Sequence, residues 1–352
     1  MQAWRDALMR AWTGQGARAL VWLLWPVSLV FGALVAVRWW LYRFGVKTQH
    51  TLPVPVVVVG NVLVGGVGKT PITMALVQHL VAQGWRVGVL SRGYGRAAHA
   101  PAVQAVLPDS TAANVGDEPL LIQRQCQVPV WVGADRVAAG RALLAQHPDV
   151  QVLVCDDGLQ HWRLARDLEL CVFDERGTGN GHLLPAGPLR ERWPRRLLSP
   201  QVPMLVLQNS TQSSPSPLPH AYPVTRQLSD VAQQANGTTR PLQSWVDQPV
   251  QAMAGIAKPE AFFDQLRAQG LTLAYTQALA DHANLNHVHL RPEHGDVLCT
   301  EKDAVKLWPA HPEAWAVPLI THLPTELLTA IDLHLSAAKQ AKLSSPHGHQ
   351  TA

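Results

Sequence analysis

Charged residues are scarce in this sequence. Asp, Glu, Lys and Arg make up only 15% of the 352 residues, against 47% hydrophobic residues, and the net charge is +4. This composition suits a well-buried core with apolar surface left for a membrane, and the length allows one large domain or two ordinary ones. No stripe of Lys and Arg with interleaved aromatic residues occurs, which argues against a nucleic-acid partner.

Cysteine is also sparse. The four cysteines are scattered, and no two of them are spaced as Cys-x-x-Cys. The sequence therefore lacks a cysteine pair for zinc or redox chemistry, and the thiols are expected to be buried in a reducing compartment. Four histidines near the C-terminal end match no zinc-ligand spacing either, namely His282, His287, His289 and His294.

The N-terminal segment 1–48 contains a run of 19 residues without a charge, Ala19–Val37. As a helix this run would be about 28 Å long, close to the hydrocarbon thickness of a bilayer. Trp39, Trp40 and Tyr42 follow it like an interfacial anchor. We expect a membrane-associated helix. A proline in mid-run also allows a kinked helix lying in the interface, and a buried core helix is the alternative.

Short runs rich in Val and Leu alternate with helical stretches over residues 49–220. Continuous apolar runs suit strands buried on both faces, which predicts an α/β fold with a mainly parallel, P-loop NTPase-like sheet. The periodicity predicts crossover helices over Thr70–Gln83 and Asp135–Ala145. The expected strands are Pro55–Gly60, Arg86–Ser91, Val128–Gly133, Val150–Asp157, Leu168–Asp174 and Val202–Gln208.

A second, smaller α/β domain is expected over residues 221–343, after a Ser/Pro-rich loop at 209–220. Residues 344–352 are predicted to form a disordered tail. The expected elements of the smaller domain are strands near Val250–Gly255, Leu271–Tyr275 and Asp296–Cys299 and helices Pro259–Gln269 and Pro324–Leu343.

A glycine-rich stretch, VGNVLVGGVGKTP, follows the first expected strand. Its glycines let the backbone fold around an anion, the Lys can reach terminal phosphates, and the Thr hydroxyl can ligate Mg²⁺. The strict pattern has glycine where this chain has Leu63, so the loop is a variant. No Asn-Lys-x-Asp sequence for guanine occurs, and adenine is therefore expected. We assign nucleotide binding to Leu63, Val64, Gly65, Gly66, Val67, Gly68, Lys69 and Thr70.

The run VQVLVCDDGLQH predicts a strand that ends in Asp156 and Asp157. In a parallel sheet the carboxyl ends of the strands face the ligand crevice. An acidic pair beside a phosphate loop is the usual place for Mg²⁺ ligation. Alone, the Asp-Asp-Gly sequence would indicate an ordinary turn, so this assignment depends on the neighbouring loop.

Four further stretches bear on the acceptor of the phosphate: SRGYGR, NVGDEPLL, LLPAGPLRERW and TEKDAVKL. With the phosphate loop, DDGLQH and GIAKPEAFF, they resemble the tetraacyldisaccharide 4′-kinase family of lipid A biosynthesis, in order from Gly60 to Leu307. The resemblance implies a P-loop kinase domain at 49–220 that uses ATP and Mg²⁺ to phosphorylate the 4′-hydroxyl of a tetraacyldisaccharide 1-phosphate. It also implies a membrane helix, and an active site on the cytoplasmic side of the inner membrane.

The resemblance also implies roles for single residues. Asp117 is the expected catalytic base, paired with His282 of LADHANL, and Lys69 is the third catalytic residue. The family has a second histidine where this chain has Ala283. The expected Mg²⁺ ligands are Thr70, Asp156, Asp157 and Glu191. The residues expected to line the acceptor side are Arg92, Tyr94, Arg96 and Arg190.

A basic cluster surrounds Trp193 in the LLPAGPLRERW region. It could hold the 1-phosphate of the substrate or bilayer headgroups, and a solvated basic face explains it equally well. The cluster consists of Arg190, Arg192, Arg195 and Arg196.

Two other functions fit parts of the sequence. GGVGKT also occurs in membrane-associated partitioning ATPases, which act as nucleotide-dependent switches. Those proteins have a signature Lys just before the glycine run, where this chain has Leu63 and Val64, and the acceptor-side motifs have no place in such a switch. A non-catalytic membrane scaffold would leave Lys69, Asp117 and Asp157 unexplained.

Overall fold

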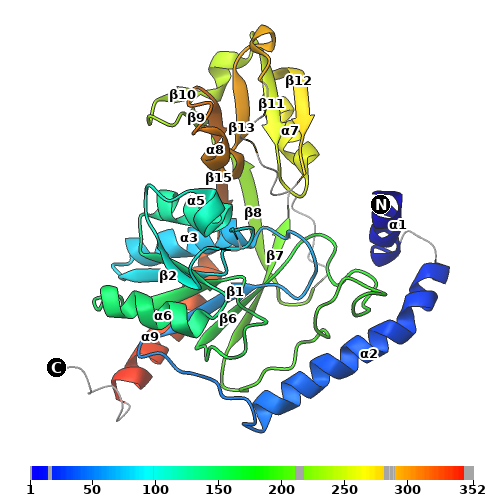
Figure 1. Ribbon diagram of the computed structural model, residues 1–352, viewed down its shortest axis with the longest axis vertical. Helices are drawn as coiled ribbons and strands as arrows, with labels where there is room; N and C mark the ends of the chain where they lie inside the picture. Colours follow the sequence, from blue (N-terminus) through cyan, green and yellow to red (C-terminus); the bar gives the residue numbers. More distant parts are fainter. Residues whose placement is uncertain are drawn as a thin grey trace.

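A computed structural model describes residues 2–14, 18–97, 99–210, 218–280, 285, 288 and 290–344. The expected catalytic His282 lies outside the described residues, as does the tail from residue 345 onward. Two sheets dominate the fold, the larger one in the centre and the smaller one above it in Figure 1.

The larger sheet has nine strands in the order β15-β8-β7-β6-β1-β5-β2-β4-β3. All neighbouring pairs are parallel except β3 with β4 and β15 with β8, which confirms the predicted mainly parallel sheet. The strands are β1 (Val56–Gly60), β2 (Val87–Ser91), β3 (Val103–Val106), β4 (Val130–Gly133), β5 (Val152–Asp156), β6 (Leu168–Phe173), β7 (Met204–Ser210), β8 (Tyr222–Leu228) and β15 (Leu319–His322).

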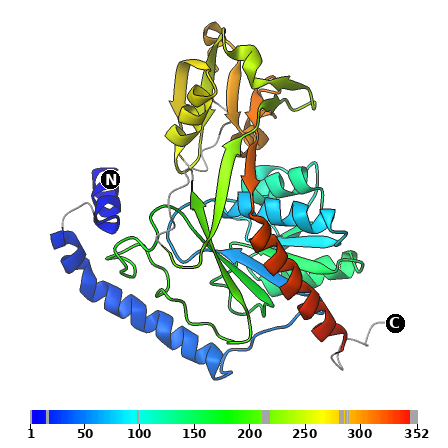
Figure 2. The same cartoon turned by 180° about the vertical axis from the view of Figure 1, so that it is seen from behind.

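The central strands of this sheet are buried on both faces. Every residue of β1, β2, β5 and β6 is buried, as continuous apolar runs predict for parallel strands packed under helices. The helix α9 contributes Leu327, Ile331 and Leu335 to the same core, and Figure 2 shows it crossing the back of the molecule. The other helices of this region are α3 (Lys69–Ala82), α4 (Ala112–Val115), α5 (Asp117–Cys126) and α6 (Arg136–Gln146), and α9 spans Thr325–Leu343.

The smaller sheet has the order β10-β9-β14-β13-β11-β12 and a core of its own. Trp245 is fully buried there, stacks edge-on with Trp315 and donates its indole N–H to Asp296 (2.8 Å). The elements are β9 (Val231–Gln233), β10 (Thr239–Pro241), η1 (Leu242–Trp245), β11 (Pro249–Ala254), α7 (Pro259–Ala268), β12 (Thr272–Ala278), η2 (Pro292–His294), β13 (Val297–Thr300), α8 (Glu301–Leu307) and β14 (Trp315–Val317).

Strand pairing ties the two sheets together. The predicted boundary near residue 220 assigns β8, β15 and α9 to the smaller domain, but hydrogen bonds place β8 and β15 in the larger sheet. The chain therefore passes between the sheets twice. It leaves the larger sheet after β8 and returns to it at β15. The division into domains remains a proposal, with these strands as the connection.

Two helices precede the first strand, α1 (Gln2–Trp12) and α2 (Arg18–Arg43). In Figure 1 they lie to one side of the sheets, with α2 as a long rod. One stripe of α2 is fixed to the body of the protein. The Ser28 hydroxyl donates to the Leu183 carbonyl (2.9 Å), and Arg38 donates to the Gln160 carbonyl (2.9 Å).

The rest of α2 is apolar and exposed. It is 26 residues long, it is long and apolar enough to cross a membrane, and only 6% of its most apolar window is buried. The side chains on this face are more than half exposed at Trp22, Leu23, Val27, Val30, Leu34 and Val37. Exposed apolar surface on this scale is typical of a protein or membrane contact.

We predict that the exposed face of α2 holds the protein on lipid. Replacing Leu23, Val30, Leu34 and Val37 with Gln should strongly reduce sedimentation with phospholipid vesicles, because each apolar side chain buried in hydrocarbon contributes on the order of 1–3 kcal/mol. The control is Leu333→Gln, which changes an equally exposed leucine on α9. Unchanged sedimentation of the fourfold variant would place the attachment elsewhere.

Candidate active site

The motif loops converge because their strands are parallel. The phosphate loop follows β1, SRGYGR follows β2, and DDGLQH follows β5. These three strands are neighbours in the order β1-β5-β2, so their carboxyl ends lie at one edge of the sheet. In an open α/β sheet this edge is where ligands bind.

The phosphate loop joins β1 to α3 in the conformation that its glycines allow. Gly65 and Gly68 have φ of 100° and 78°, a region that other residues rarely adopt. A side chain at Gly68 would also collide with Arg226 and with the Asn209 amide. Leu63 stands where the strict pattern has glycine. It is fully buried and forms a bridge to residue 189, so this position needs a core residue rather than a flexible one.

Lys69 and Thr70 connect the loop to the acidic strand end. The Lys69 ammonium lies 3.3 Å from Asn61 Oδ1 and 3.5 Å from Asp157 Oδ1. The Thr70 hydroxyl lies 3.3 Å from Asp156 Oδ2. The structure thus brings together the predicted phosphate-binding Lys, the hydroxyl and both carboxylates. Asp157 follows the last residue of β5 and has a φ of 50°.

Asp156 is held in a setting that opposes its charge. Burial, followed by the nearby charges of Glu118 and Asp157, raises the pKa of Asp156 to about 7, although the Thr73 hydrogen bond (2.7 Å) and Lys69 act in the other direction. A divalent cation at this place would favour the charged carboxylate. The setting is therefore that of a carboxylate which a metal ion would complete.

The residues present fit a Mg²⁺ ion that is shared with a bound nucleotide. Among the residues that the structure describes, no group of three or more His, Cys, Asp and Glu side chains could hold a metal ion alone. Mg²⁺ is commonly held by one or two carboxylates, waters and substrate phosphates rather than by a protein cage. Asp156, Asp157 and Thr70 beside a phosphate loop match that description.

Glu191 and Arg190 lie at the same edge but are engaged differently. Arg190 Nη1 lies 3.9 Å from Asp157 Oδ1. Glu191 is buried, and its two oxygens accept hydrogen bonds from Gln160 and Arg195, each at 2.9 Å. The role of Glu191 as a Mg²⁺ ligand stays a prediction, and its carboxylate is held by these two partners.

The basic cluster expected around Trp193 is not a single face. Arg192 and Arg196 are exposed and Arg190 is half-buried. Arg195 has only 2% of its side chain exposed and is paired with two glutamates. The prediction that the cluster could bind the 1-phosphate or headgroups is therefore wrong for Arg195, because burial and pairing remove it from ligands.

Asp117 begins α5 and is buried between two lysines. Its Oδ2 atom lies 3.8 Å from the Lys302 ammonium and 3.7 Å from that of Lys306, both on α8. Its Oδ1 atom accepts the Glu118 backbone N–H (3.1 Å). The carboxylate of NVGDEPLL and the lysines of TEKDAVKL thus form one charged group, which spans the larger and the smaller sheet.

The SRGYGR loop lies against the start of α5. A side chain at Gly116 would come within 2.9 Å of the Tyr94 carbonyl oxygen, so the two loops touch directly beside Asp117. Arg92 and Tyr94 are exposed, and Arg96 donates to the Ala102 carbonyl (3.1 Å). The backbone of the SRGYGR loop therefore lies beside Asp117, and the acceptor-side roles of its side chains stay a prediction.

A cavity of about 350 Å³ opens between the phosphate loop and the smaller sheet. Its polar lining includes Lys69, Thr70 and Arg226, and its apolar lining includes Ile256 and Phe262. The Nε atom of Arg226 is buried and makes no hydrogen bond to the part of the chain that the structure describes. The cavity combines cationic and apolar lining residues, which suits a nucleotide with charged phosphates and an apolar base.

Several site residues were missed by sequence reasoning. Lys302 and Lys306 stand in TEKDAVKL and Gln160 in DDGLQH, so the motifs contained them without indicating their partners. Thr73 follows the phosphate loop by one helical turn, a spacing that could have indicated a second hydroxyl on the same face. Arg226 lies on β8, where the sequence has no motif at all.

A phosphate loop between strand and helix, with carboxylates ending the adjacent strand, defines a P-loop nucleotide-binding protein of the α/β class. The sequence model of the LpxK family, described as tetraacyldisaccharide-1-P 4′-kinase, matches residues 20–336. The chain belongs to this family.

Similar proteins agree with this membership. The chain is 50% identical to the tetraacyldisaccharide 4′-kinase of Polaromonas naphthalenivorans (strain CJ2) over 352 residues, 99% of each chain. It is 50% identical to that of Acidovorax sp. (strain JS42) over 333 residues, 94% of this chain and 95% of the relative. Its fold matches a crystal structure of "apo" form LpxK from Aquifex aeolicus in complex with ATP, with a TM-score of 0.75 and 25% identity, covering 90% and 99% of the two chains. The expected family and fold class are confirmed.

Glu301, which lines the cavity, gives a testable pH dependence. Burial raises its pKa to about 7, against 4.5 ordinarily, while the Leu319 N–H (3.1 Å) opposes the shift. As the pH rises, the Glu301 carboxyl loses its proton in the unfolded chain before it does so in the folded protein. Between pH 4.5 and about 7 this should lower the free energy of unfolding by about 3 kcal/mol.

The measurement compares wild type and Glu301→Gln by denaturant unfolding from about pH 4 to about pH 8. The variant should gain stability relative to wild type as the pH rises. Glu260→Gln changes an exposed glutamate and is the control. A stability difference that does not change with pH would contradict the raised pKa.

Proposed function

We propose that this protein is an ATP-dependent kinase that transfers the γ-phosphate to the 4′-hydroxyl of tetraacyldisaccharide 1-phosphate in lipid A biosynthesis. Membership of the family and the names of relatives at 50% identity support this activity. One observation of the site supports it most. A buried carboxylate, Asp117, lies beside the acceptor-side loop, at the sheet edge that also holds the phosphate loop.

ATP would occupy the cavity beside the phosphate loop. The loop N–H groups and the start of α3 would bind the phosphates, and Lys69 would stabilise charge on the transferred group. The adenine would lie toward the apolar lining that includes Ile256 and Phe262. The solved LpxK structure with ATP supports this choice of nucleotide.

Mg²⁺, when bound, would neutralise charge on the β- and γ-phosphates. Thr70, Asp156 and Asp157 are the residues that would hold it, with Glu191 as a further predicted ligand. Thr73 would orient Asp156 through its hydrogen bond of 2.7 Å. The ammonium of Lys69 is near Asp157 and is free to turn toward a phosphate, since its nearest carboxylate oxygen is 3.5 Å away.

Asp117 would accept the proton of the attacking hydroxyl, and His282 is proposed as its partner. The Lys302 and Lys306 ammonium groups, at 3.8 Å and 3.7 Å, would hold the carboxylate in position. Arg92, Tyr94, Arg96 and Arg190 are proposed to line the disaccharide. Attachment through α2 would place this site at the cytoplasmic surface of the inner membrane, where an acylated substrate resides.

The alternative is a membrane-associated ATPase switch, and one assay separates the two. Purified protein in detergent receives γ-labelled ATP, Mg²⁺ and tetraacyldisaccharide 1-phosphate. Label in the lipid supports the kinase. Label released only as inorganic phosphate, with or without lipid, would favour the switch and remove the basis for the acceptor-side assignments.

Lys69→Ala should lower kcat by about three powers of ten or more, because the Lys69 ammonium would no longer stabilise the charge on the transferred phosphoryl group. The measurement is label transfer to lipid. The control is Lys339→Ala. Lys339 lies on α9, over the ring of Trp85, and this variant should have normal turnover. Near-normal turnover by the Lys69 variant would refute the phosphate-loop assignment.

Asp117→Asn should keep ATP binding and lose phosphoryl transfer by about two to four powers of ten, the range of general base catalysis. ATP affinity is measured by calorimetry and transfer by the lipid assay, with the exposed Asp109→Asn as control. Lost ATP affinity would instead identify Asp117 as a nucleotide ligand.

A further inference from the structure

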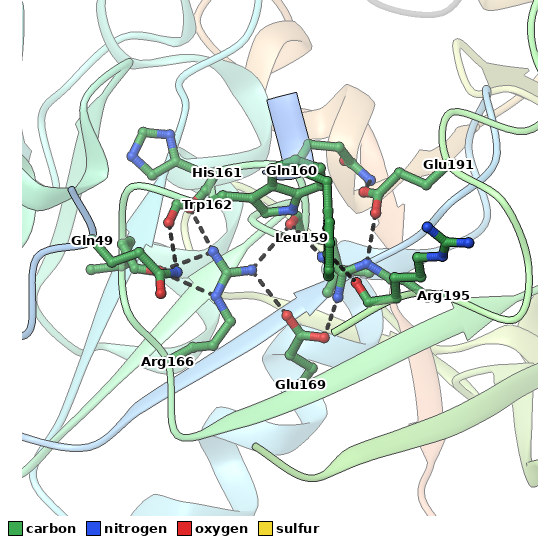
Figure 3. A network of polar contacts seen from close by, with 12 residues as sticks. Gln49, Leu159, Gln160, His161, Trp162, Arg166, Glu169, Glu191 and Arg195 are labelled. Carbon is green, nitrogen blue, oxygen red and sulfur yellow. Dashed lines mark hydrogen bonds and ion pairs between the residues drawn. The ribbon is translucent and has the colours of Figure 1, made fainter. Parts of the chain in front are cut away.

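A buried chain of four alternating charges contacts the turn that follows Asp156 and Asp157. It runs from Arg166 through Glu169 and Arg195 to Glu191, and Figure 3 shows the four side chains in contact. Each has between 2% and 7% of its side chain exposed. Burying ions is costly, so such a chain is weak evidence of added stability, while removing one member leaves an uncompensated buried charge.

Arg195 is the centre of this chain, since each guanidinium nitrogen has its own acceptor. Nε donates to Glu191 Oε2 (2.9 Å), Nη1 donates to Glu169, and Nη2 donates to the Leu159 carbonyl (3.0 Å). Only a planar fork with fixed donor directions satisfies three such acceptors at once. A lysine at this position would leave two of them without their partner.

The same contacts fix the turn that follows the acidic strand end. The Leu159 carbonyl accepts from Arg166 (3.0 Å) as well as from Arg195, and Arg166 also donates to the His161 carbonyl (2.5 Å). Gln160 lies between these two anchored carbonyls. Its backbone is therefore held on both sides by buried guanidinium groups.

The Gln160 side chain reaches the reacting region. Its Nε2 donates to the Asn61 carbonyl and to Glu191 Oε1, both at 2.9 Å, and its Oε1 lies 3.5 Å from Arg190 Nη1. Asn61 Oδ1 is the acceptor for the Lys69 ammonium. The order of contacts thus leads from Arg195, through Glu191 and Gln160, to the groups nearest the phosphates.

We propose that Arg195 is a positioning residue for phosphoryl transfer. It holds Glu191 and the turn at residues 158–164, so that Gln160 keeps Arg190 and Asn61 in their reactive places. Arg195 itself touches neither substrate nor nucleotide. This inference depends on the proposed kinase activity, and it assigns the buried arginine to catalysis rather than to folding alone.

The first test compares Arg195→Lys with wild type in the lipid phosphorylation assay. We expect kcat to fall by about 30- to 100-fold, since a displacement near 1 Å at reacting groups can cost 10²-fold, while the KM for ATP changes less than about threefold. The melting temperature is measured on the same samples. Arg163→Lys is the matched control, because Arg163 lies in the same turn but forms an exposed pair with Asp135.

Chemical rescue supplies the second test. A cavity of about 260 Å³ is lined by Arg166, Glu169 and Arg195 among others, and would admit a small cation. In Arg195→Ala, guanidinium at non-denaturing concentration should restore at least about tenfold in kcat. Glu169→Gln combined with Arg195→Ala removes one charge of each sign, and keeps the test valid if the single variant does not fold.

Three outcomes would overturn the inference. The first is a folded Arg195→Lys variant with kcat within about threefold of wild type. The second is guanidinium restoring the melting temperature but not kcat, which would make the role purely structural. The third is a wild-type protein that transfers no label to lipid, which would refute the proposed kinase as well. The first two outcomes leave the kinase activity intact, so the two failures are distinguishable.

Discussion

The parallel pairing of β5 with β1 and β2 is the constraint on which the site depends. Because these strands point the same way, the phosphate loop, the Asp156–Asp157 pair and the SRGYGR loop all lie at one edge of the sheet. Full burial of the strands on both faces fixes the edge rigidly. The reacting groups thus stand at the ends of strands and the starts of helices, and the buried apolar core holds these ends in place.

Charge at this edge is arranged in two separate layers. In front, single carboxylates face cations at distances of 3.5 Å or more, as Asp157 does with Lys69 and Asp117 with Lys306. Behind, the arginines and glutamates are closely hydrogen-bonded and almost without solvent. The longer distances in the front layer suit groups that would turn toward the phosphates and the Mg²⁺ of the proposed reaction. In the rear layer, removing one partner would leave a buried charge uncompensated.

Much of this could be predicted from sequence, and for identifiable reasons. Runs such as VVVVG and VLVCD indicate buried parallel strands because no polar face interrupts them, and Lys69 and Thr70 are placed by local spacing alone. The pairing of β8 with the edge strand β15 was not predictable. β8 alternates buried and exposed residues, and its antiparallel partner lies about 90 residues later in the chain. Arg195 was wrongly placed in the ligand-binding cluster, because the sequence of a basic cluster does not show which arginine is buried.

The contacts of α2 have a consequence for where the reaction takes place. Ser28 is fastened to the segment before Arg190, and Arg38, nearly three helical turns later, to the backbone of Gln160. The helix is therefore fixed against two segments that border the site, and a membrane that receives its apolar face would lie at a constant distance from them. An acceptor sugar whose acyl chains stay in that membrane would then approach the site while its chains remain in the lipid.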